Sequence, residues 1–218
     1  MVVLSPVNNE AWDEEEVSRK IRFFTRVYPD KYTNYFQDKK RAIVPYIKGK
    51  SLDDDKVSEL FQNPQERIPL FKTIAEKIKS ANEKGLVIID IHAGNILYDF
   101  KGKTCFLIDG GLSHLIGEPI LKGQLETQMH IDGLREMYPQ FAPECFSLAG
   151  RPPALAQPKM DVYAFGVMMK TLIRKEHLDD NMSNLIAQCT DENPDVRPTI
   201  QEVIENLEQL ESRLVNAI

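Results

Sequence analysis

Two short apolar runs, each followed by an aspartate, limit the fold of this 218-residue chain more than any other feature. Residues 86–89 stand before Asp90, and residues 104–108 stand before Asp109. Apolar runs of this length predict buried strands. We therefore expect a small β ribbon that carries one aspartate on the loop after each strand.

Helical spacing dominates the rest of the chain. Apolar residues recur at steps of three and four in residues 13–27, which predicts a helix with one buried face. Residues 41–47 indicate a strand that enters a loop, whereas residues 110–158 are rich in Gly and Pro and predict a long loop region with short helices at most. Further helices are expected at 51–62, 68–83, 160–174, 182–189 and 200–215. The fold class is therefore α+β, with a small mixed part followed by a larger, mostly helical part.

The composition excludes several kinds of function. There are 27 basic and 33 acidic residues, so the net charge of −6 argues against a surface that coats nucleic acid. No apolar run is long enough to span a bilayer, so we expect no transmembrane segment. Three widely spaced cysteines fit a reducing, cytoplasmic setting, and neither they nor the four histidines have the spacing of a zinc site.

The loops after the two strands carry the residues that chemistry needs. Asp90 and Asn95 share one loop, and Asp109 begins the other. In phosphoryl transfer one carboxylate orients the attacking hydroxyl, while an amide oxygen and a second carboxylate hold Mg²⁺. The alternative is that all three residues only cap turns, because Asp and Asn favour loops.

The order of the motifs resembles the protein kinase family. Asp90 and Asn95 keep the spacing of its catalytic loop H-R-D-L-x-x-x-N, and Asp109 and Gly111 keep the first and third places of its metal loop D-F-G. The other segments that match in the same order are A-P-E at 142–144, D-V-Y-A-F-G-V at 161–167 and N-P-D-V-R-P-T at 193–199.

This resemblance implies a protein-kinase-like bilobal fold and a set of roles. Residues 1–47 would form a partial N-lobe and hinge, with helix C and two or three strands, and residues 48–218 a mostly helical C-lobe. The family's cofactors are ATP and Mg²⁺. The resemblance makes Asp90 the base, assigns Asn95 and Asp109 to the metal, places ATP near Val44, Tyr46, Ile47 and Leu97, pairs Glu144 with Arg197, and lets Asp161 brace the catalytic loop.

The chain also departs from the family's pattern. It has no Gly-rich loop and no strand lysine, since Leu4 or Ser5 stands where that lysine is expected. In the family a glutamate on helix C pairs with that lysine, and Arg19 or Lys20 occupies the corresponding position here. Lys20 either supplies the missing ammonium group to the ATP phosphates or is a solvated lysine on a charged helix face.

Two further departures lie on the catalytic and metal loops. Ile88 and Ile89 replace the family's His-Arg, so we do not expect activation by phosphorylation of the loop. Gly110 replaces the D-F-G phenylalanine, and two adjacent glycines predict a flexible metal loop.

Three functions remain open from the sequence. The first is a divergent, slow protein kinase that moves the ATP γ-phosphate to a protein hydroxyl, with Ser or Thr favoured over Tyr. The second is a pseudokinase that binds a nucleotide or a partner, and the third is a small-molecule or lipid kinase. The incomplete N-lobe predicts either that an upstream segment is missing from this chain or that a protein partner covers its open edge. Residues 28–30 and 44–50 also resemble kinase-like proteins that intracellular bacteria secrete into host cells.

Overall fold

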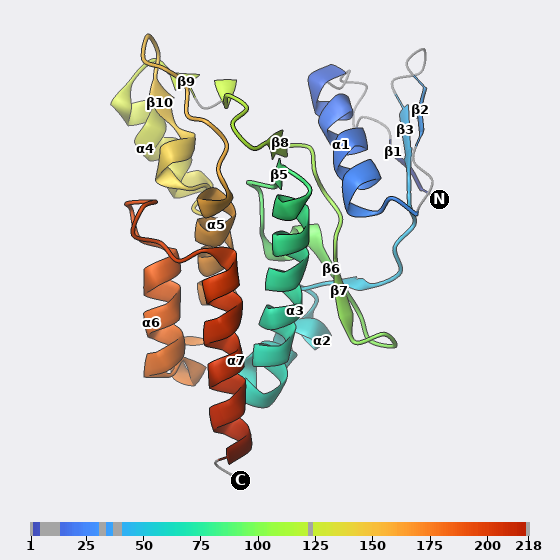
Figure 1. The fold of residues 1–218 in the computed structure, drawn as a ribbon, viewed down its shortest axis with the longest axis vertical. Helices are drawn as coiled ribbons and strands as arrows, with labels where there is room; N and C mark the ends of the chain where they lie inside the picture. Colours follow the sequence, from blue (N-terminus) through green and yellow to red (C-terminus); the bar gives the residue numbers. More distant parts are fainter. Residues whose placement is uncertain (1, 5–13, 31–33, 37–40, 122–123, 217–218) are drawn as a thin grey trace.

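The computed structural model describes residues 2–4, 14–30, 34–36, 41–121 and 124–216. In this part of the chain the fold is α+β, as the sequence predicts, with long helices and short strands (Figure 1). None of the described helices is both long enough and apolar enough to cross a lipid bilayer.

The N-terminal part combines one helix with one antiparallel sheet. Strand β3 (Arg41–Val44) lies between β1 (Val2–Leu4) and β2 (Asn34–Phe36), and Val2 pairs with Val44. Helix α1 (Glu14–Val27) lies beside this sheet (Figure 1) and has three glutamates in its first turn, where the helix dipole favours negative charge.

A second small sheet follows, in the order β4-β6-β7. The strand predicted before Asp109 is β7 (Thr104–Leu107). It forms a two-stranded ribbon with β6 (Ile96–Asp99) and does not pair with the strand predicted before Asp90, while β4 (Lys50–Ser51) pairs with β6. The single helix expected at 51–62 is wrong. After β4, Asp54 caps the short helix α2 (Asp55–Ser58) with its side chain, and a 3₁₀ turn, η3 (Glu59–Gln62), follows.

Helix α3 (Pro64–Glu83) is the central element of the larger part (Figure 1). Asn63 caps its start, so the helix begins four residues earlier than the sequence predicts. Gly85, with a φ of 78°, lets the chain leave the helix and enter β5 (Leu86–Val87).

Three more helices complete this part of the molecule, and we call these four helices the helical base. Two of the three contact α3, and the third packs against those two. The predicted helices at 160–174, 182–189 and 200–215 are confirmed with shifts of about two residues at their ends. Phe71 of α3 contacts the rings of both Phe61 and Phe165, which are all fully buried. The three helices are α5 (Pro158–Leu172), α6 (Asp180–Cys189) and α7 (Ile200–Asn216), with a 3₁₀ turn η7 (Lys175–His177) before α6.

The region from 110 to 158 is more ordered than the sequence predicts. It contains α4 (Gln128–Met137), a ten-residue helix that Thr127 caps, instead of short helices only. Its strands are β8 (His114–Leu115), which pairs with β5, and β9 (Gln124–Leu125), which pairs in parallel with β10 (Ser147–Leu148). Two 3₁₀ turns, η4 (Ala93–Asn95) and η6 (Pro143–Cys145), lie on the loops that hold the candidate site.

Candidate functional site

Asp90 and Asn95 meet on the loop between β5 and β6. The Asn95 amide Nδ2 donates to the backbone oxygen of Asp90 at 3.1 Å and lies 3.3 Å from its Oδ2. Gln140 donates to the other carboxylate oxygen at 3.0 Å. Each oxygen of Asp90 therefore accepts one hydrogen bond and keeps a lone pair for a substrate hydroxyl.

A buried carboxylate holds the backbone just before Asp90. Asp161, on α5, is fully buried and accepts from the amides of Ile88 and Ile89 at 2.8–3.0 Å and from Asn82 at 2.8 Å. Ile89 has a φ of 70°, which is rare and strained for a β-branched residue. The contact that the resemblance implies for Asp161 is thus present, and it fixes a strained turn that aims Asp90.

Burial disfavours the charged form of Asp161. Removal from water raises the pKa of Asp161 to about 6, and the three hydrogen bonds from Ile88, Ile89 and Asn82 only partly oppose this rise. Asp161 is therefore ionised at neutral pH, as its three donors require, and becomes protonated in mildly acidic solution.

Asp109 lies beside Asn95 at one end of the β6–β7 ribbon. Ile96 pairs with Leu107, and the amide of Ile108 donates to the backbone oxygen of Asn95 at 3.0 Å. The chain therefore delivers Asp109 next to Asn95. The Asp109 side chain is 42% exposed, and its Oδ1 accepts from the amide of Gly111 at 2.7 Å.

Lys20 reaches this carboxylate from α1. Its Nζ lies 3.5 Å from Asp109 Oδ2 and 3.4 Å from Glu16 Oε1, and its side chain is only 12% exposed. A lysine this well covered is not the solvated lysine that the sequence allows as one alternative. The ammonium group therefore lies between the Asp109 carboxylate and that of Glu16, which is one helical turn earlier on α1.

Contacts with α1 fill the space beside Gly110, which stands where the resemblance expects a phenylalanine. A Cβ added to Gly110 would lie 2.1 Å from Cγ of Phe23, so the ring of Phe23 occupies the space beside the loop. Arg19 Nε donates to the backbone oxygen of Gly111 at 2.7 Å. The two glycines predict a flexible loop, but the structure packs it against α1 and ties it there.

The four residues assigned to ATP line one apolar cavity. Val44, Tyr46, Ile47 and Leu97 come together around a space of about 200 Å³. Tyr46 is 63% exposed and lies at the rim. The remaining wall is made by Phe24, Pro45 and Ile108, the last of which directly precedes Asp109.

Glu144 and Arg197 form the pair that the resemblance implies. The guanidinium group donates to both carboxylate oxygens, at 2.6 and 2.8 Å, and Arg197 is 1% exposed. It also lies 4.8 Å from the ring centre of Tyr163. This pair anchors the segment that carries Gln140 to the helical base.

Sequence reasoning missed Gln140, and His92 also lies close to Asp90. Gln140 stands two residues before Ala142-Pro143-Glu144, and that position was the only available signal for it. The His92 ring accepts from the amide of Gly94 at Nδ1, so the proton of the neutral ring sits on Nε2, which lies 3.8 Å from Asp90 Oδ2. His92 thus caps a turn and faces the candidate base.

The residues at the ribbon end fit a divalent cation. Asn95 Oδ1 accepts no hydrogen bond from any described residue, and the Asp109 carboxylate is partly open to solvent. Among the described residues no cluster of three or more His, Cys, Asp or Glu could hold a metal by itself. Two protein oxygens, with the rest from phosphate and water, is the arrangement that Mg²⁺ usually takes.

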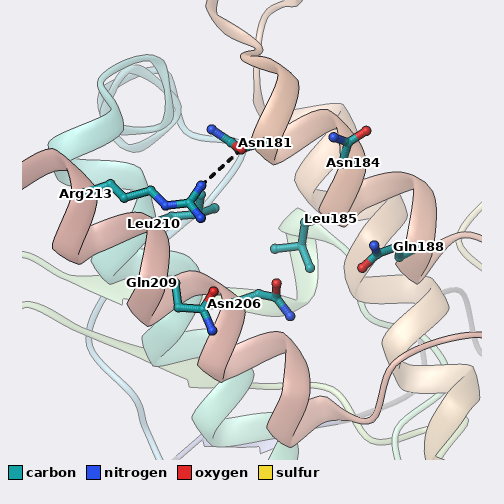
Figure 2. A pocket seen from close by; sticks show the side chains of 8 residues that line it. All are labelled: Asn181, Asn184, Leu185, Gln188, Asn206, Gln209, Leu210 and Arg213. Carbon is teal, nitrogen blue, oxygen red and sulfur yellow. Dashed lines mark hydrogen bonds between the residues drawn. The ribbon is translucent and has the colours of Figure 1, made fainter.

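A separate groove between α6 and α7 lacks such chemistry. Its lining combines amide side chains with Arg213, whose Nη1 donates to Asn181 Oδ1 at 3.3 Å (Figure 2). Leu185 and Leu210 complete it, and neither a carboxylate nor a histidine lines it. The groove therefore offers hydrogen bonds but no group for acid–base or metal chemistry.

Neither protein-family models nor curated proteins give a match to this chain. Ser5, one of the two positions expected for the strand lysine, lies outside the described residues, and the structure describes only the backbone of Leu4.

Proposed function

We propose that the chain is a divergent protein-kinase-like phosphotransferase that uses Mg²⁺ and ATP to phosphorylate a protein hydroxyl, with Ser or Thr favoured over Tyr. In this proposal residues 1–47 act as a partial N-lobe and hinge and residues 48–218 as the C-lobe. A single observation carries it. The apolar cavity that contains Val44 and Leu97 ends at Ile108, next to Asp109 and Asn95. ATP needs an apolar cavity for its adenine ring directly beside the residues that hold the metal ion and the phosphates.

Each polar residue then has one task. Asp90 orients the acceptor hydroxyl and takes up its proton. Each of its carboxylate oxygens accepts one hydrogen bond, from Asn95 or from Gln140, and keeps a lone pair for this task. Asn95 and Asp109 hold Mg²⁺, which when bound neutralises charge on the transferred phosphate. Lys20 places its ammonium group on the phosphates from α1, where it is already close to Asp109.

The rate should be low. Arg19 or Lys20 stands where the resemblance expects the glutamate of helix C, and this chemistry depends mainly on positioning and electrostatics. The relocated Lys20 and the packing of Phe23 against Gly110 compensate for only part of that loss.

A pseudokinase is the second candidate, and the same lysine favours it. An ammonium group 3.5 Å from Asp109 can neutralise this carboxylate without a metal ion. The chain would then bind a nucleotide or a protein partner and turn nothing over. A small-molecule or lipid kinase is the third outcome that the test below separates.

The test measures ATP binding by calorimetry, with and without Mg²⁺, and radiolabel transfer to protein substrates. We expect Asp109→Asn to abolish the Mg²⁺-dependent part of binding and Asp90→Asn to keep binding but lower transfer by about 10²-fold or more. Asp99→Asn is the matched control, because Asp99 lies at the opposite end of the same ribbon.

The outcomes separate the candidates. ATP binding without transfer in wild type and both site variants establishes the pseudokinase. Transfer to an aminoglycoside or inositol, and not to protein, establishes the small-molecule kinase. Absence of ATP binding by the wild type rejects both kinase functions and leaves, of the pseudokinase, only a module that binds a protein partner.

Lys20 has its own test. Lys20→Met should weaken ATP binding about tenfold or more, and Lys20→Arg should restore part of it, because a cation on a phosphate is worth a charge-assisted hydrogen bond. Unchanged affinity in Lys20→Met would refute the phosphate role for Lys20 and leave the roles of Asp90 and Asp109 intact.

A further inference from the structure

Three arginines on one face of α1 hold this helix against the larger part of the molecule. Arg19, Arg22 and Arg26 are three and four residues apart, so their side chains lie on the same side of the helix. They donate to the backbone oxygens of Gly111, Ser113 and Lys84, at 2.7, 3.3 and 2.6 Å respectively. Among the described residues, Arg22 alone of the three also pairs with a carboxylate outside α1.

Glu118 is the carboxylate that Arg22 binds. Nη2 of Arg22 donates to Oε2 of Glu118 at 3.0 Å, and Nη1 donates to Oε1 at 3.4 Å. The two side chains are 24% and 34% exposed, so both are partly shielded from water. An arginine that meets both oxygens of a shielded carboxylate forms a stronger and better oriented pair than two exposed charges do. The pair joins α1 to the segment that follows the metal loop.

Glu118 is held in place independently of Arg22. Its amide donates to the backbone oxygen of Leu115 at 2.9 Å and closes a turn in which Gly117 has a φ of 82°. Its carboxylate accepts from the amide of Leu115 at 2.7 Å, and the amide of Ala156 donates to its backbone oxygen at 2.9 Å. Burial raises the pKa of Glu118, but the Leu115 amide and Arg22 outweigh it, so the pKa lies below its ordinary value. Glu118 is therefore a fixed negative charge at neutral pH.

The same arginine contacts the turn that follows Asp109. Ser113 closes this turn, because its amide and its hydroxyl donate to the backbone oxygen of Gly110 at 3.0 and 2.7 Å. Arg22 binds the backbone oxygen of Ser113, and two residues earlier on α1 Lys20 reaches Asp109. The ion pair thus fixes the helix that contacts the metal loop at both its beginning and its end.

We propose that Arg22 and Glu118 form a permanent clasp that positions α1 against the metal loop without phosphorylation of the chain. Many switches order a segment by adding a phosphate group that an arginine binds. Here a carboxylate of the chain itself supplies that negative charge. The inference rests on the proposed function, because the helix that the clasp positions carries Lys20. Arg22 and Glu118 are positioning residues, since neither lines the apolar cavity next to Asp109.

The first test measures amide hydrogen exchange of the full chain without nucleotide. The amides of Gly111 and Ser113 are both hydrogen-bonded within the loop. In Arg22→Met and in Glu118→Gln we expect these amides to exchange about tenfold or more faster, because a charge-assisted bond that holds the loop closed is lost. The amides of residues 88 and 89 should keep their rates, since a carboxylate of the helical base holds them.

Arg26→Met is the matched control. Arg26 lies one turn further along the same face of α1, but its acceptor, the backbone oxygen of Lys84, is outside the metal loop. Its loss should change exchange in the loop less than about twofold. The charge swap Arg22→Glu with Glu118→Arg restores opposite charges, so it should recover part of the protection that either reversal alone removes.

Calorimetry with ATP and Mg²⁺ then connects the clasp to the proposed site. Glu118→Gln keeps the size of the side chain and should weaken binding about fivefold or more, whereas Arg26→Met should weaken it less than about twofold. Treatment of the wild type with a phosphatase should leave both the affinity and the exchange rates unchanged, because the clasp contains no phosphate.

The outcomes separate the clasp from the proposed function. Unchanged exchange at Gly111 and Ser113 in both Arg22→Met and Glu118→Gln would overturn the clasp. Effects no larger than those of Arg26→Met, or a loss of protection on phosphatase treatment, would overturn it as well. If the wild type binds no ATP but the two variants still expose the loop, the proposed kinase functions fail and the clasp stands.

Discussion

Two buried arginines show how differently the helical base and the α1 side of the molecule accommodate a charge. Arg197 is 1% exposed, and all three of its side-chain nitrogens donate to oxygens, two of them on Glu144. Arg19 is 3% exposed, yet its only carboxylate, Glu15, is 62% exposed, and its Nη2 has no partner. All three side-chain nitrogens of Arg197 are therefore paired, whereas Arg19 is buried with one nitrogen left without a hydrogen bond.

The same contrast applies to the candidate site. Asp161 positions Asp90 from within the helical base, through three hydrogen bonds that involve no solvent-exposed group. Asp109 instead depends on α1, whose Lys20 and Phe23 contact the metal loop. We infer that the helical base fixes the loop that carries Asp90. The placement of α1 then decides whether the loop at 109–111 can bind a metal ion.

The largest predicted effect comes from breaking the buried ion pair of Arg197 and Glu144. Arg197→Met should lower the free energy of unfolding by about 3–5 kcal/mol, because it leaves the Glu144 carboxylate without its cation. Arg19→Met should cost only about 1–2 kcal/mol, since it removes one strong hydrogen bond and an exposed ion pair. Chemical denaturation of both variants measures the difference, and equal losses would contradict the contrast.

The buried brace predicts a pH dependence. The pKa of Asp161 is about 6 in the folded chain and 3.8 without burial, so the folded state favours the protonated form. Stability from this group is therefore full below about pH 4 and is lost as pH rises through 6, by about 3 kcal/mol in total.

Asp161→Asn isolates this effect from other titrating groups. The stability of the wild type minus that of Asp161→Asn should fall by about 3 kcal/mol between pH 4 and pH 7. Denaturation at a series of pH values measures it. A difference that does not change with pH would mean that burial of Asp161 is not the source.

The α1 contact predicts a smaller but sharper effect. Gly110→Ala should destabilise the chain by about 1–3 kcal/mol, because its Cβ would collide with the buried ring of Phe23. Gly133→Ala is the matched control on α4, where a Cβ meets nothing within 4 Å and should add about 0.5–1 kcal/mol of stability. Thermal unfolding of the two variants should give opposite shifts, and a neutral Gly110→Ala would mean that α1 does not pack there.

Local patterns predicted the helical base well. Helical spacing and the stop at Gly85 act within one or two turns, so the sequence carries them directly, but periodicity missed the Asn63 cap and placed the start of α3 four residues too late. The pairing of Glu144 with Arg197 was expected only because these motifs resemble those of the protein kinase family. The helix expected at 51–62 failed because the Asp54 cap interrupts it, a signal that periodicity ignores.

The α1 contacts could not be predicted in the same way. Arg19 and Gly111 are 92 residues apart in the chain, and only tertiary packing brings them together. The covered position of Lys20 next to Asp109 depends on the same packing. Gln140 belongs to this class as well, since 50 residues separate it from Asp90.

The most direct test of the central claim replaces Mg²⁺ by paramagnetic Mn²⁺ in the presence of ATP and follows the broadening of backbone amide signals. If Asn95 and Asp109 hold the metal together, signals of Asn95, Ile108 and Asp109 should broaden at low Mn²⁺, while Asp99 at the far end of the ribbon should not. Broadening at the acidic residues 53–55 alone, or no ATP-dependent broadening, would contradict the account.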